Sequence, residues 1–195
     1  FQLEKLEAVE TGYKTSNTPP ETGWQPFLPG TRVRGKDEHF WFRMSLKTPK
    51  EKPFTYYCVK FITGYEGQRG GTPQGLVYVN GEMMQGCDAN HTDVFLQPDT
   101  EYTLHNHFYL GIPELESPLD ISLWETDEKT EQLYYDMKVA LDSCMLLNPN
   151  SDEYIAVMTV LEQTANMIDF REPGSERYRA SIDSAIDNIG NDLYT

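Results

Sequence analysis

The chain has 195 residues, a hydrophobic fraction of 38% and a formal net charge of −15 at pH 7. That length can bury one good core, or one core with a helical appendage. The acidic excess argues against non-specific nucleic-acid binding, which needs a basic surface to displace counterions, and against docking on anionic lipid. No apolar run approaches the roughly 18 residues that span a bilayer. Small neutral ligands and protein partners remain open.

Three cysteines, Cys58, Cys87 and Cys144, form an odd number without CxxC spacing. This usage favours a reducing compartment over a disulfide-bonded secreted protein, so it predicts a cytoplasmic location. Cys58 and Cys144 lie in apolar stretches, where a cysteine usually acts as a small buried hydrophobe.

The first two thirds of the chain predict β-structure. Residues 1–35 are rich in Thr, Pro and Gly, which predicts an irregular N-terminal arm. Residues 36–125 hold short aromatic and β-branched runs separated by turns, and Asn80-Gly81 is the preferred signal for a type I′ hairpin. Strands are predicted at 39–48, 54–63, 76–79, 82–85, 93–97, 101–110 and 119–124. Without helices between them, they predict an antiparallel β-sandwich of the jelly-roll or galactose-binding-domain-like type.

Residues 126–195 change to the helical period and predict about three amphipathic helices. The first shows apolar residues at spacings of three and four from Leu133 to Cys144. Asn148-Pro149-Asn150 ends it, and Ser151 is the predicted N-cap of the second. A third stripe runs from Tyr178 to Leu193. These stripes predict a helical core, and the fold class is mainly β with an α appendage.

Metal and catalytic signals are weak. His105 and His107 lie two apart on a predicted strand, so both imidazoles point to one face, where His91 or Asp88 could complete a zinc site. A structural zinc site needs four ligands, and the competing interpretation is a polar strand face, so no metal site is expected. The 31 acidic residues make chance carboxylate pairs common. No nucleophile elbow, P-loop or HExxH motif occurs, and no catalytic residue is predicted.

Sugar binding relies on aromatic faces and polar groups, and Trp24, Tyr65 and His91 are the predicted contact residues. Trp41 and Trp124 lie in strand patterns, which favours a place in the core. Trp24 lies between Gly23 and Pro26, where it either is exposed or pins the arm to the sandwich.

Four stretches resemble one enzyme family. They are GKDEHFWFR at 35–43, PQGLVYVNG at 73–81, QGCDANH at 85–91 and LYYDMKVAL at 133–141. In this order they are similar to the region before the catalytic barrel of cytosolic-type α-mannosidases, the zinc-dependent retaining enzymes of glycoside hydrolase family thirty-eight. The family's His-x-His-x-Asp stretch is missing, so no catalytic residue carries over.

The resemblance implies a non-catalytic accessory domain, with 126–195 as a helical linker leading to a catalytic domain. The implied partner is that domain on the same polypeptide, and zinc would belong to it rather than to this segment. Mannose-containing glycans and a homo-oligomer are further candidate partners. Two alternatives stay open: a free-standing carbohydrate-binding module and a protein-interaction domain with a large apolar patch.

Overall fold

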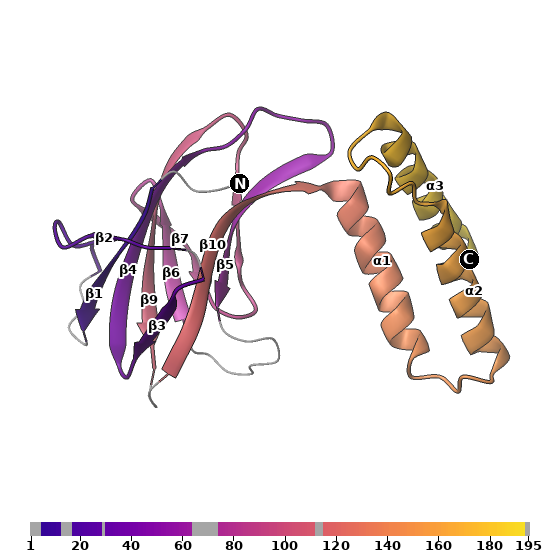
Figure 1. Cartoon of the computed structure of the whole chain (residues 1–195), viewed down its shortest axis with the longest axis horizontal. Helices are drawn as coiled ribbons and strands as arrows, with labels where there is room; N and C mark the ends of the chain where they lie inside the picture. The colour runs from indigo at the N-terminus through magenta and orange to yellow at the C-terminus, as the bar shows by residue number, and fades with distance from the viewer. Residues whose placement is uncertain (1–4, 13–16, 29, 64–73, 112–114, 194–195) are drawn as a thin grey trace. The chain divides into compact units, whose positions relative to one another are not determined.

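The computed structural model describes residues 5–12, 17–28, 30–63, 74–111 and 115–193 (Figure 1). The chain divides into two compact units, Phe1–Glu125 and Thr126–Thr195. The described part of the first unit consists of antiparallel strands, and that of the second consists of three helices. This confirms the predicted class, mainly antiparallel β-structure followed by helices.

The strands form two sheets. The six-stranded sheet has the order β2-β1-β4-β9-β6-β7 and the four-stranded sheet the order β3-β10-β5-β8. The first comprises β1 (Lys5–Gly12), β2 (Gln25–Pro26), β4 (Glu38–Lys47), β6 (Gln74–Val79), β7 (Glu82–Cys87) and β9 (Glu101–Leu110). The second comprises β3 (Arg32–Gly35), β5 (Thr55–Thr63), β8 (Asp93–Leu96) and β10 (Leu115–Asp127).

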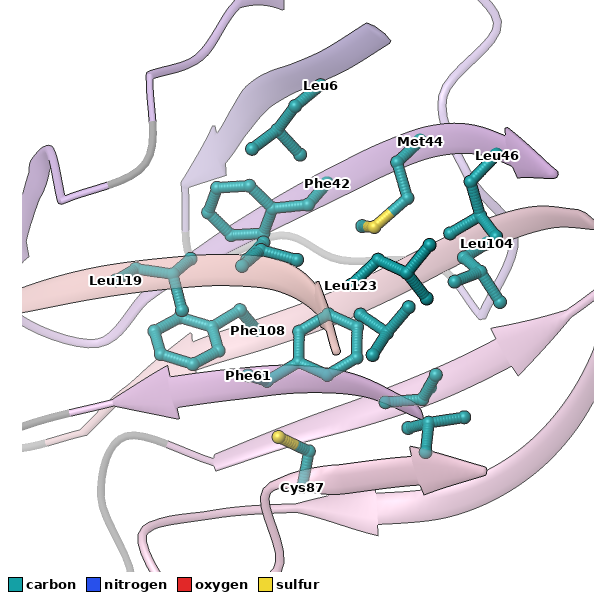
Figure 2. Packing of buried hydrophobic residues seen from close by; sticks show 14 of the residues in the cluster. Leu6, Phe42, Met44, Leu46, Phe61, Cys87, Leu104, Phe108, Leu119 and Leu123 are labelled. Carbon is teal, nitrogen blue, oxygen red and sulfur yellow. The ribbon is translucent and has the colours of Figure 1, made fainter. Parts of the chain in front are cut away.

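One hydrophobic core joins side chains from both sheets. On β4 the buried positions Phe42, Met44 and Leu46 follow the two-residue period of a strand. Figure 2 shows them with Phe61 of β5 and with Leu119 and Leu123 of β10 in a single cluster. Because alternate residues of a strand face opposite sides, Trp41 and Arg43 lie on the other face of the six-stranded sheet.

The predicted irregular arm at residues 1–35 is wrong, because this segment contains strands. β1 pairs antiparallel with β4 from Lys5↔Ser45 to Gly12↔His39, and β3 pairs with β10. Leu6 and Val33 are buried in the core. The composition is poor in strand formers, but pairing with β4 supplies the backbone hydrogen bonds and half-buried surface that favour a strand.

The Asn80-Gly81 hairpin between β6 and β7 is confirmed. Both residues have positive φ, 51° and 88°, as a type I′ turn requires. The Asn80 side-chain oxygen also accepts a hydrogen bond from the Thr103 amide at 2.9 Å, which fastens the turn to β9. The register shifts between Val77 and Tyr78, so β7 carries one extra residue, as in a bulge.

The helices are α1 (Glu128–Cys144), α2 (Asp152–Met167) and α3 (Glu176–Leu193). Ser151 caps α2 as predicted, because its hydroxyl accepts a hydrogen bond from the Tyr154 amide at 3.2 Å. The helices share a separate core of Leu133, Ala140, Leu161, Ile182, Ala185 and Ile189. Of the helices in the described ranges, none has the length and apolarity needed to cross a membrane.

Candidate functional site

The structure places the predicted site residues in two regions. His105 and His107 lie on one face of β9, and Trp24 lies against His105 with ring centroids 6.2 Å apart. His91 is elsewhere, beside Asp88 in a pocket after β7. Tyr65 lies outside the described residues.

The first region, called the histidine face here, is a run of stacked rings across β4 and β9: His39, Trp41, His107 and Tyr109. Trp41 stacks on His107 with centroids 4.5 Å apart and planes 1° apart. His39 Nδ1 and His107 Nε2 are 3.1 Å apart and share a hydrogen bond. His39 also stacks on Tyr109 at 4.6 Å. The cross-strand register, Trp41↔His107 and His39↔Tyr109, sets this order.

Trp24 is held against the same face. Its indole N–H donates to the Pro20 carbonyl at 3.0 Å, and the Arg43 guanidinium lies 4.4 Å from the ring centroid. Arg43 Nε in turn donates to Glu7 at 2.7 Å. Of the two alternatives for Trp24, these contacts favour pinning the chain to the sheet.

The surroundings of the two predicted histidines favour the neutral imidazole. Burial, and then the neighbouring His39, lowers the pKa of His107 to about 4. Burial, and then Arg43, lowers the pKa of His105. Both rings are therefore neutral at pH 7 and cannot donate a proton as imidazolium. In the described ranges, no group of three or more His, Cys, Asp or Glu side chains could hold a metal ion.

The depressed pKa of His107 makes the first unit sensitive to acid. Between its ordinary pKa of 6.5 and its folded pKa of about 4, the unfolded chain binds more protons than the folded chain. The contribution of His107 to the free energy of unfolding should be fully present above pH 6.5 and should be lost as the pH falls towards 4. The expected loss is about 1–2 kcal/mol, because solvent partly screens this half-buried ring. Urea unfolding at several pH values checks this. His107→Gln should flatten the dependence of the unfolding free energy on pH. An unchanged dependence in this variant would contradict the role of His107.

The second region, called the β7 pocket here, has a volume of about 500 Å³. Its lining is Gln74, Gly75, Leu76, Gln85, Gly86, Cys87, Asp88 and His91. Gly75 is needed because a Cβ there would lie 2.8 Å from Asn106 Oδ1, whereas a Cβ on Gly86 would meet only the Gly75 carbonyl at 3.9 Å. The pocket is therefore floored partly by bare backbone.

Asp88 is fixed by its own turn. Its Oδ1 accepts hydrogen bonds from the amides of Asn90 at 2.8 Å and His91 at 2.9 Å, and it lies 2.9 Å from His91 Nδ1. The hydrogen bond from the Asn90 backbone is the main cause that lowers the pKa of Asp88. The pocket therefore presents an oriented carboxylate beside an exposed imidazole, which suits hydroxyl groups of a neutral ligand.

Cys87 of the same pocket is not a nucleophile. Burial, and then the charge of Asp88, raises the pKa of its thiol to about 12. Since the thiolate is the reactive form, the thiol stays inert at pH 7.

The sequence names His91 as a candidate sugar contact and Asp88 as a possible zinc ligand, and the structure places both in the β7 pocket. His39 was missed, although it shares the face of Trp41 on an alternating strand, and that alternation was an available signal. Gly75 and Gly86 were also missed, since nothing local showed that their backbone floors a pocket.

No family model matches the chain, and no curated protein matches it. Among solved structures, the chain is similar to two structures of the β-glucosidase from Kluyveromyces marxianus. One is selenomethionine-labelled and the other is in complex with glucose. Each shares 10% identity with it over 69% of the chain, with TM-scores of 0.40 and 0.39. The chain covers 16% and 18% of those two structures, less than a fifth of their length.

Proposed function

We propose that this chain is a non-catalytic accessory domain of a glycoside hydrolase and that its β7 pocket binds a saccharide. The observation that carries the proposal is the oriented Asp88 carboxylate in an open pocket of about 500 Å³. That volume falls within the range of small-molecule sites. Sugar hydroxyls would donate to Asp88 and bond with His91 and the Gln74 amide, while Leu76 would contact a C–H face.

The chemistry of the pocket supports binding without catalysis. A retaining glycosidase needs two carboxyl groups about 5–5.5 Å apart. The pocket lining includes one carboxylate, Asp88, and a thiol that stays protonated. On the histidine face, the low pKa of His107 keeps its imidazole neutral at pH 7, and this ring shares a hydrogen bond with His39.

The narrower form of the proposal is that the parent enzyme is a zinc-dependent retaining α-mannosidase. Its support is the sequence resemblance. Two of the four resembling stretches, 73–81 and 85–91, supply the lining of the β7 pocket. In this form, 36–125 is a jelly-roll-like sandwich and 126–195 is a linker to a zinc-holding catalytic domain of the same cytoplasmic polypeptide. Mannose-containing glycans would be the ligands.

Titration calorimetry of the chain with methyl α-mannoside and methyl β-glucoside tests the proposal. Weak binding, with a dissociation constant on the order of millimolar, is expected for one of them. Asp88→Asn should weaken it about tenfold or more, because it replaces a charged acceptor. Gly86→Val should fill the pocket and abolish binding, since little surrounds its Cβ. Asp99→Asn, at an exposed carboxylate of the β8–β9 turn, should leave binding unchanged.

The outcomes test the saccharide site and the narrower mannosidase form separately. Binding of the glucoside alone would keep the saccharide site and remove the mannosidase form. Binding of neither sugar by the folded chain, or equal loss in Asp88→Asn and Asp99→Asn, would overturn the site.

A free-standing carbohydrate-binding module would use the same pocket. An immunoblot of source-cell extract with an antibody against this chain distinguishes the two. A band several times heavier than the chain supports the accessory domain, and a band at its own size supports the module.

A further inference from the structure

The helical unit carries an apolar groove of about 880 Å³ between α1 and α2. Tyr134 and Leu141 of α1 and Ile155 of α2 line it, and all three are exposed. Met137 and Met158 lie among them and also pack on the helical core. The groove therefore continues outward from that core as an open apolar surface.

The side of the groove formed by α1 is a second apolar face of that helix. The first face carries Leu133 and Ala140, which are buried in the helical core. A surface helix that buries one face normally shows polar residues on the other. Here the second face carries Tyr134 and Leu141, and exposed Met145 and Leu146 follow where α1 ends. Exposed apolar patches of this kind mark interaction sites.

The charges around the groove decide which occupant fits. Its lining includes two carboxylates, Asp142 and Glu162, and one ammonium, Lys138, which lies 2.6 Å from Asp142. From Thr126 onward the chain has 5 basic and 14 acidic residues, and before it 11 and 17, so the units carry −9 and −6. A second copy would bring like charges together, which disfavours self-association through this groove.

We propose that the groove binds a basic amphipathic helix of a partner protein. Tyr134 and Leu141 are seven residues apart, which is about two helical turns or roughly 10 Å. A partner helix with apolar residues at i, i+3 or i+4, and i+7 would fill that length. Lysine or arginine residues beside the stripe would pair with Asp142 and Glu162. This proposal is independent of the saccharide pocket.

Fluorescence anisotropy tests it on the whole chain with two designed peptides of about five turns. Both carry the same leucine stripe at i, i+3, i+4 and i+7, and their polar faces are lysine in one and glutamate in the other. The lysine peptide should bind at least about tenfold more tightly, and raising the salt to about 0.5 M should reduce the difference, because salt screens surface charge. Equal affinity for both peptides would overturn the proposal.

A pair of variants locates the binding surface. Leu141→Asp places a charge in the groove and should weaken the lysine peptide at least about tenfold. Val139→Asp makes the same change on α1 outside the groove lining, at a side chain 58% exposed, and should bind as the unchanged chain does. Circular dichroism confirms that both remain helical. Equal weakening in both variants, or a dimer in sedimentation that Leu141→Asp abolishes, would show that the groove has another role.

Discussion

Phe61→Ala should lower the free energy of unfolding of the first unit by about 3–5 kcal/mol. Phe61 is 0% exposed on β5 and lies in the core that joins the two sheets (Figure 2). Its removal leaves a cavity lined by groups that strands on both sides hold in place, so collapse is limited. Urea unfolding followed by tryptophan fluorescence measures the change. All three tryptophans precede Thr126, so this signal reports the first unit.

Phe95→Ala is the matched control. Phe95 is on β8, the hydrogen-bonded neighbour of β5, and its side chain is 57% exposed. Its ring contacts Tyr56 with centroids 5.3 Å apart, so its loss should cost less than about 1 kcal/mol. Similar losses for the two phenylalanines would mean that the two sheets do not share the core.

Trp41→Ala should also cost about 3–5 kcal/mol, and it should change a second observable. Trp41 is 0% exposed, and its ring covers that of His107. Without the indole, water reaches the imidazole, so the pKa of His107 should rise from about 4 towards 6.5. An NMR titration of the histidine ring protons follows that pKa, and urea unfolding gives the stability.

Trp124→Ala provides the comparison, because Trp124 is 44% exposed and Lys60 Nζ lies 5.0 Å from its ring centroid. It should cost about 1 kcal/mol or less and leave the titration of His107 unchanged. Trp41→Phe, which keeps a stacked ring, should retain most of the depressed pKa. A His107 pKa that stays near 4 in Trp41→Ala would contradict the idea that the indole shields the imidazole.

The features that sequence predicted well have local causes. Two residues with positive φ define the Asn80-Gly81 hairpin, and the Ser151 cap depends on an amide three residues away.

The features that sequence missed depend on partners far along the chain. β1 is a strand because β4 pairs with it, from Gly12↔His39 to Lys5↔Ser45, which are 27 and 40 residues apart. The stack of Trp41 on His107 follows from a register between β4 and β9 that no nearby residue specifies. The strand pattern predicts that Trp41 is buried, and it is. It lies, however, on the face of the sheet opposite Phe42, outside the core between the sheets.

The extra residue in β7 has a consequence for solubility. Among the described strands, β7 is an edge of the six-stranded sheet, with β6 as its neighbour, and Met83 and Met84 are exposed on it. A flat apolar edge invites another chain to add a strand, which begins aggregation. The shifted register beside Tyr78 bends this edge and interrupts its ladder, so an incoming strand finds few backbone groups in regular order. The irregularity that shapes the hairpin thereby also protects the molecule from joining edge to edge with its own copies.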